Sequence, residues 1–83
     1  MTRSAISSSS TATEAYEITP DDDNDLAVPT RGIYVGVSGD LKVDMVDIGT
    51  VTFVELASGM IHSISAKRVY STGTDAASIL GLY

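Results

Sequence analysis

The segment that decides the fold is residues 33–45, which read IYVGVSGDLKVDM. Its first five residues are rich in β-branched and aromatic side chains, which are typical of strands. Its last five residues alternate between apolar side chains that would face a core and charged side chains that would face solvent. Ser38-Gly39-Asp40 lies between them as a hairpin-type connection, because glycine adopts positive φ without steric cost. The segment therefore predicts two consecutive strands joined by a tight turn.

Similar short apolar runs lie on both sides of this segment, separated by turns that contain glycine or aspartate. No stretch shows the periodicity of an amphipathic helix. Strands spaced roughly 8–12 residues apart predict an all-β fold, a small single-domain β-sandwich or barrel-like fold of about seven antiparallel strands. The strands are expected at 14–19, 33–37, 41–45, 50–56, 60–66, 69–70 and 76–83. A bulge is expected at Lys67-Arg68. In the strand 50–56, Leu56 is expected on the same face as Thr52 and Val54, opposite Phe53.

The chain divides at about residue 13. Residues 14–83 form the predicted β domain, whereas residues 1–13 are mostly serine, threonine and alanine with no hydrophobic period. This Ser/Thr-rich N-terminal arm is expected to be either a solvated tail or an interaction arm. The arm has no apolar h-region, which predicts synthesis and folding in a cytosol.

Small size limits how the domain can be stabilised. The chain has 83 residues, no cysteine and one histidine. A domain of this length buries only about 60% of its unfolded surface, so disulfides, a metal or oligomerisation usually add stability. Disulfides and zinc sites built from cysteine or histidine are excluded by composition. Oligomerisation or docking onto a partner protein remains, and we expect a homo-oligomer without a cofactor.

Net charge excludes two classes of partner. The formal charge is −6, from 11 acidic and 5 basic residues. Nucleic acid binding requires a cluster of basic side chains that neutralises phosphates, and an anionic membrane surface attracts the same kind of cluster. We predict no nucleic acid and no membrane partner, because the positive charges are few and scattered: Arg3, Arg31, Lys42, Lys67 and Arg68.

Catalytic and metal-binding patterns are weak. His62 is the only imidazole and there is no Gly-x-Ser-x-Gly motif, so we predict that the protein is not an enzyme. Asp21, Asp23 and Asp25 alternate like the start of a calcium loop, but the sixth and twelfth positions are Leu26 and Gly32 rather than Gly and Glu. A solvated acidic loop is expected, with an irregular calcium site as the alternative.

Protein interfaces are the remaining kind of site. Tyrosine combines apolar area with a polar tip and is common at interfaces, although these tyrosines could also be ordinary core or surface residues. Pairing of edge strands between copies would satisfy exposed backbone groups. The candidate interface residues are Arg3 and Ile6 in the arm, and Arg31, Tyr34, Tyr70 and Tyr83 in the domain.

The order of several short motifs resembles a known family. Residues 30–36, TRGIYVG, lead into residues 38–41, SGDL, and Arg68-Val69 precedes Thr72-Gly73-Thr74 before an aromatic C-terminus. From residue 16 to 83 the chain resembles the head spike base proteins of gene transfer agents and related alphaproteobacterial tailed phages. It departs from that pattern at His62-Ser63, where the family often has proline.

This resemblance implies a structural virion protein on the outer surface of the head. It implies an oligomeric ring, with a pentamer as the candidate, that sits on the major capsid protein at capsid vertices and anchors a spike or fibre protein. A ring requires heterologous contacts that close. Two alternatives remain at this point, a decoration or cement protein on the head lattice and a glycan- or receptor-binding surface module.

Overall fold

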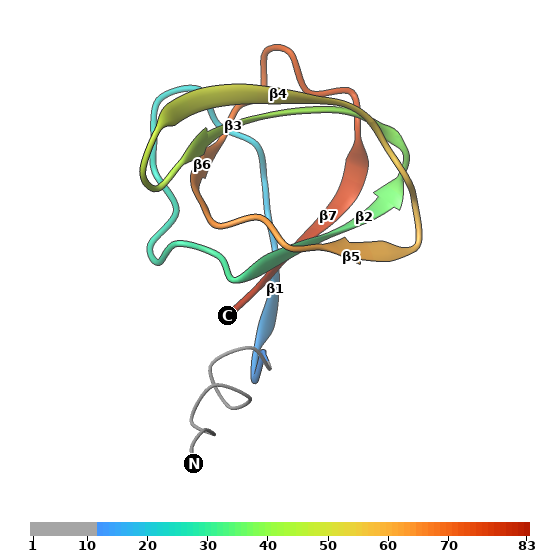
Figure 1. Cartoon of the computed structure of the whole chain (residues 1–83), viewed down its shortest axis with the longest axis horizontal. Coiled ribbons are helices and arrows are strands. Elements are labelled where there is room, and N and C mark those ends of the chain that lie inside the picture. The colour runs from blue at the N-terminus through green and yellow to red at the C-terminus, as the bar shows by residue number, and fades with distance from the viewer. Residues whose placement is uncertain (1–11) are drawn as a thin grey trace.

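The computed structural model describes residues 12–83, so the predictions for Arg3, Ile6 and most of the arm lie outside the described residues. The domain is all-β, as predicted, with seven antiparallel strands (Figure 1). Their bounds are β1 (Ala15–Glu17), β2 (Gly32–Val37), β3 (Gly39–Met45), β4 (Gly49–Leu56), β5 (Met60–His62), β6 (Ala66–Val69) and β7 (Ala77–Leu82).

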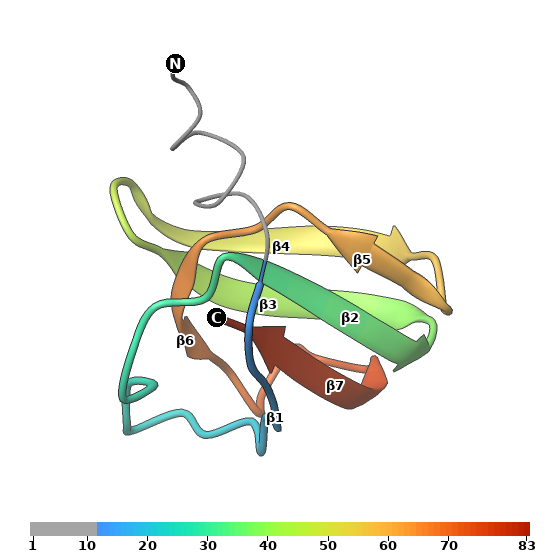
Figure 2. The ribbon, with the colours of Figure 1, turned by 90° about the horizontal axis from the view of Figure 1, so that it is seen from below.

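The strands form two sheets that pack as layers (Figure 2). The four-stranded sheet has the order β1-β7-β2-β5, and the three-stranded sheet has the order β4-β3-β6. Strands β2 and β3 belong to different sheets, so the predicted hairpin between them is wrong. The chain turns a corner at Ser38 because the next residues are held by the segment before β7: the carbonyl of Asp40 accepts hydrogen bonds from the amides of Asp75 and Ala76, at 2.8 and 3.1 Å.

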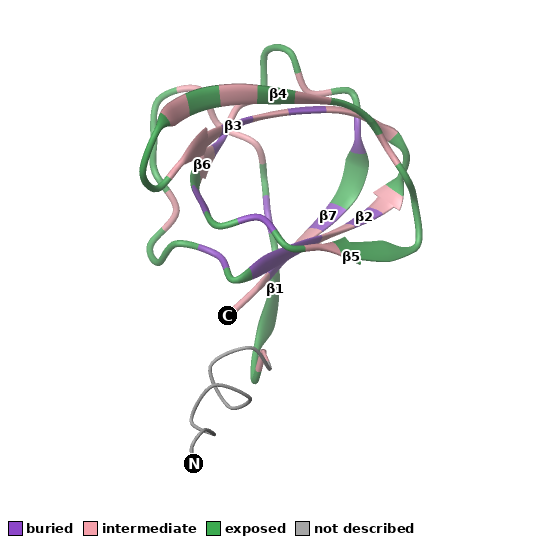
Figure 3. Cartoon of the chain, in the orientation of Figure 1, coloured by how far each residue is buried: buried purple, intermediate pink, exposed green. Residues whose placement is uncertain are grey.

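The core lies between the two layers (Figure 3). The predicted alternation in β3 is confirmed, because Leu41 and Val43 are fully buried and Met45 packs against the core. Successive side chains of a strand point to opposite faces, which is why alternate residues supply the core. The buried apolar residues are Ile18, Ile33, Val35, Leu41, Val43, Ile64, Ala66, Val69, Ala76 and Ile79.

Strand β4 contains an irregularity that the sequence pattern did not predict. The β3–β4 register shifts between Gly39 and Leu41, and Glu55 adopts a positive φ of 52°. One extra residue in a strand reverses the facing of the residues after it. Leu56 therefore packs against the core together with Phe53, so its predicted position on the face of Val54 is wrong.

The predicted strand 60–66 is in fact two strands in different sheets. β5 ends at His62, residues 63–65 cross between the layers, and β6 begins at Ala66. The predicted bulge at Lys67-Arg68 is confirmed: Arg68 pairs with Asp44 and Ala66 pairs with Met45, so Lys67 is the extra residue of β6 at the register shift. The crossing is fixed by its surroundings, because Ile64 is buried within it.

The loop from residue 18 to residue 30 closes one side of the sandwich. Along the outer edge of β6, the carbonyls of Ala66, Lys67 and Val69 accept hydrogen bonds from amides of this loop, at 2.7–3.0 Å. Thr30 ends the loop, and its buried hydroxyl bonds to the backbone on both sides of Ser65.

Among residues 12–83, β4 pairs only with β3, so its other edge has no partner strand.

Candidate interaction surfaces

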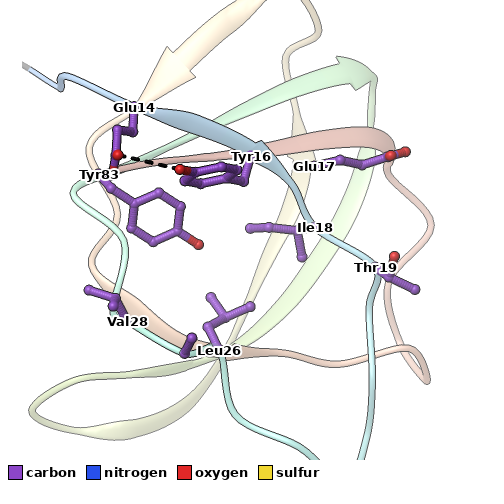
Figure 4. Close-up of a pocket in the computed structure, with 9 residues that line it drawn as sticks. Glu14, Tyr16, Glu17, Ile18, Thr19, Leu26, Val28 and Tyr83 are labelled. Carbon is purple, nitrogen blue, oxygen red and sulfur yellow. Dashed lines mark hydrogen bonds between the residues drawn. The ribbon is translucent and has the colours of Figure 1, made fainter.

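An apolar groove lies where the two ends of the domain meet. β1 runs antiparallel to the end of β7, with Tyr16 opposite Gly81. The C-terminal residue is fixed by the backbone: the amide of Tyr83 donates to the carbonyl of Glu14 at 2.9 Å, and its own carbonyl accepts from the amide of Thr13 at 2.9 Å. This pairing brings Glu14 and Tyr16 together with Tyr83, which is far away in sequence, on one wall of the groove (Figure 4).

Two tyrosines form that wall. The ring centroids of Tyr16 and Tyr83 are 5.8 Å apart and the planes are tilted by 51°, within the range of favourable aromatic pairs. The hydroxyl of Tyr16 donates to a carboxylate oxygen of Glu14 at 3.3 Å. Burial raises the pKa of the Tyr83 hydroxyl, because desolvation disfavours the phenolate. The pair thus presents two aromatic rings to the groove.

Aliphatic side chains complete the groove. Ile18 lies between the two walls, and Leu26 and Val28 form the wall opposite the tyrosines (Figure 4). The cavity has a volume of about 350 Å³, in the range of small-ligand and side-chain pockets. No lining residue is basic, and the carboxylate of Glu14 stands at the tyrosine end. The groove can therefore hold an apolar side chain next to a positive charge.

A second apolar surface is the outer face of the four-stranded sheet. Tyr34 of β2 lies between its register partners Ile61 of β5 and Leu80 of β7, so the three side chains share one face. A Cβ atom placed on Gly32 would lie 3.2 Å from Ile61 Cγ2 and 3.5 Å from Leu82 Cδ1, so these two side chains flank the glycine on the same face. Ile61 is 63% exposed, and among residues 12–83 no second layer covers this face.

The other predicted interface residues lie elsewhere. Tyr70 is held within its own domain, with its ring 5.0 Å from Lys42 Nζ and 5.7 Å from the guanidinium carbon of Arg68. Its hydroxyl donates to Asp44 at 2.9 Å, and hydrogen bonds from Thr50 and then from Tyr70 hold the pKa of Asp44 below its usual value. Arg31 is exposed just before β2. Its amide donates to the carbonyl of Leu82, the residue before Tyr83, at 2.7 Å.

The acidic loop is organised by hydrogen bonds within the chain. The carboxylate of Asp22 accepts from the amides of Ser71 and Thr72 at 2.8 and 2.9 Å and from the Thr72 hydroxyl at 2.6 Å. These bonds lower the pKa of Asp22, the Thr72 hydroxyl contributing most. Asp25 pairs with Arg68 at 2.8 Å, which raises the pKa of the guanidinium.

The same loop bears on the calcium alternative. Asp21 accepts from the Asn24 side chain and from the amide of Asp23, which lowers its pKa. Among residues 12–83 no three acidic or histidine side chains gather as metal ligands. Asp21 thus stabilises the turn, and Asp25 forms an ion pair with Arg68.

His62 has a local structural contact. Its Nε2 lies 3.0 Å from the carbonyl oxygen of Ala57, across the turn between β4 and β5. No other imidazole exists in the chain to form a dyad.

Within residues 12–83 there is no helix of the length and apolarity that a bilayer crossing requires.

The groove and the outer face contain residues that sequence reasoning missed. Tyr16, Val28 and Leu80 were not candidates. Tyr16 and Leu80 become neighbours of Tyr83 and Tyr34 only through the pairing of β7 with β1 and β2, and Val28 lines the groove from the loop before β2. A usable signal was present for Val28, which follows the acidic loop in a short apolar run.

Comparison with known proteins gives one informative match. No protein-family model matches the chain, and no curated protein matches it. A chain in a solved structure described as the capsid of a native GTA particle, computed with C5 symmetry, is 36% identical. The match covers 88% of this chain and 84% of that chain, with a TM-score of 0.78.

Identity and fold agree over nearly the whole of both chains, which defines this protein as a structural component of a virus-like particle. GTA denotes gene transfer agent. The chain belongs to the same family as that capsid chain, the family of a gene transfer agent structural protein.

Proposed function

We propose that this chain is the head spike base subunit of a gene transfer agent particle. Copies form a ring on the outer surface of the head at its vertices, contact the major capsid protein, and anchor a spike or fibre protein. The observation that carries the proposal is the match to a capsid chain whose structure was computed with C5 symmetry, which is the symmetry of a ring of five. A structural role without catalysis agrees with that relative.

The described surfaces support a subunit with several neighbours. A closed ring uses two different surfaces of each copy, since one surface of a copy meets another surface of the next. Two separate apolar surfaces, the groove beside β1 and the outer face of the four-stranded sheet, are available for contacts with different neighbours. Apolar residues at both would be covered in an assembly, which adds stability to a small domain.

The location is tested by electron cryomicroscopy of purified particles without imposed icosahedral symmetry. The proposal expects density for this chain at fivefold vertices only, beneath the spike. Density spread over the threefold or quasi-threefold positions would instead identify a lattice cement protein. Absence from the particle would refute both roles, and glycan binding by the free protein would then be measured.

A matched pair of variants tests the outer face. Ile61 and Ile48 are both exposed, at 63% and 76%, but only Ile61 lies on the face with Tyr34. We expect Ile61→Asp to leave the domain folded and to lower the amount of this chain per purified particle, because a buried carboxylate at an interface is costly. Ile48→Asp, in the β3–β4 turn, controls for the added charge and should retain normal incorporation. Equal incorporation of both variants would exclude the face as an assembly surface.

A further inference from the structure

The apolar groove beside β1 is open to water in the described domain. Tyr16 and Val28, on opposite walls, are 58% and 57% exposed. Covering such surface is favourable because apolar area is removed from water. The chemistry of the walls therefore defines an occupant whose inserted part is apolar.

Charge narrows the choice of occupant. Glu14 stands at the tyrosine end of the groove, and none of the lining residues is basic. The loop that leads to the opposite wall carries Asp21, Asp22, Asp23 and Asp25. Arg68 already forms an ion pair with one of these residues, Asp25. A segment that places a positive charge next to an aliphatic side chain complements this surface.

The chain itself contains one segment of that kind outside the described residues. Residues 1–6 read MTRSAI. Arg3 is the only basic residue before Arg31, and Ile6 is the only branched aliphatic residue in the arm. Basic and aliphatic groups thus occur together, three positions apart, in a part of the chain that is otherwise small and polar.

The point at which the arm joins the domain indicates which copy it reaches. Thr13 and Glu14 are bonded to Tyr83, and β1 then runs along the groove wall towards Ile18, so the chain enters β1 from the end opposite Ile18. Returning to the same groove would require a tight turn, yet residues 7–13, SSSSTAT, contain no glycine, proline, asparagine or aspartate. The 11 residues before Ala12 can span up to about 36 Å, enough to reach a neighbouring domain.

We propose that residues 1–6 of one copy bind in the groove of a second copy, with Ile6 against the rings of Tyr16 and Tyr83 and Arg3 beside Glu14. Each copy then gives one arm and receives one, which is a heterologous contact able to close into a ring. The inference rests on the proposed function and deepens it by naming a contact that joins adjacent subunits.

The absence of cysteine makes this contact directly measurable on the full chain. A nitroxide is attached to Ser4→Cys, and this spin-labelled chain, at natural isotope abundance, is mixed with ¹⁵N-labelled chain that has no spin label. Any paramagnetic signal loss in this mixture arises between copies. We expect loss at the amides of Tyr16, Val28 and Tyr83. A nitroxide on Ser58→Cys, in the exposed β4–β5 turn, is the matched control and should spare these amides.

Charge reversal supplies a second readout. Glu14→Lys in the ¹⁵N-labelled copy should abolish the signal loss, and Arg3→Glu in the spin-labelled copy should restore it. Circular dichroism of each variant checks that the exposed substitutions leave the fold intact.

Two results would overturn the proposal. Signal loss that occurs only when the label and the isotope are on the same molecule would show that the arm folds back on its own domain. No signal loss at the groove in either sample would show that the arm does not bind there. Because the measurement uses purified chain, its failure is separate from failure of the vertex location, which is judged on particles.

Discussion

Thr30→Val tests how the loop that closes the β6 side is held in place. Thr30 is 2% exposed, and it is the one polar residue buried in the described domain. Its hydroxyl donates to the carbonyl of Ile64 at 2.8 Å and accepts from the amide of Ala66 at 3.0 Å. Valine has nearly the same shape but can make neither bond, so a buried carbonyl and a buried amide each lose this partner.

The magnitude follows from those two groups. Each buried backbone group left unsatisfied costs about 1–3 kcal/mol. The amide of Thr30 still donates to the carbonyl of Ala66 at 3.0 Å, so the loop remains attached and the cost falls in the lower part of the summed range. We expect Thr30→Val to lower the free energy of unfolding by about 2–4 kcal/mol, against a total of about 4–12 kcal/mol for a domain of this size.

Urea unfolding, followed by circular dichroism and tyrosine fluorescence, measures this difference by linear extrapolation. Thr30→Ser is the matched control, because it keeps the hydroxyl and removes one buried methyl group, for a loss of about 1 kcal/mol. A Thr30→Val variant within about 0.5 kcal/mol of the parent, below the loss expected for one buried group, would refute the reasoning. Equal losses of unfolding free energy in Thr30→Val and Thr30→Ser would also refute the reasoning, because the effect would then come from packing rather than from the hydroxyl.

Three further substitutions test other parts of the structure. Gly36→Ala places a Cβ 2.7 Å from Ser78 Cβ and 3.0 Å from the carbonyl oxygen of Ser78. We therefore expect thermal unfolding to show a loss of about 1–3 kcal/mol in the free energy of unfolding, and an unchanged Tm would contradict this close approach. Glu55→Gly removes the cost of a positive φ of 52° on a non-glycine residue and should stabilise by up to about 1 kcal/mol in urea, whereas destabilisation would show that the bulge depends on the side chain. The pKa of Asp22 in the folded chain lies below 3.8, the ordinary value for an aspartate, so its contribution to stability is present above that value and is lost as pH falls through the folded pKa. Asp22→Asn should therefore make the free energy of unfolding fall less steeply below about pH 4.8, one unit above the ordinary aspartate value. The same pH dependence in the variant and the parent would show that the hydrogen bonds to Thr72 do not make stability depend on pH.

Strand positions were predictable because their signal is local. The alternation of Leu41 and Val43 with charged residues repeats every two positions and needs no knowledge of the partner strand. The partners themselves were not predictable. Whether β2 continues into a hairpin or turns a corner at Ser38 depends on bonds between Asp40 and a segment 35 residues later in the sequence.

In the candidate site, too, single residues could be predicted from the sequence, whereas their neighbours depend on how the strands pair. Tyr83 was predicted as an interface residue from its chemistry alone, and it does line the groove. Tyr16 and Val28 were missed because each reads as an ordinary strand or loop residue until β1 pairs with β7. The facing of Leu56 was mispredicted because the bulge at Glu55 is set by Asp40 on the neighbouring strand, whose carboxylate accepts the Glu55 amide at 3.0 Å.

The exposed apolar residues follow from the size of the domain. Two thin sheets bury ten apolar side chains, and a larger core would need more chain than 83 residues supply. Some exposed apolar residues, among them Tyr16, Val28 and Ile61, lie on a groove wall or a sheet face that a second chain can cover. Binding that occurs only in the folded state stabilises that state by mass action, so assembly and folding reinforce each other. In the proposed assembly, a subunit of this kind would gain stability where it contacts its neighbours.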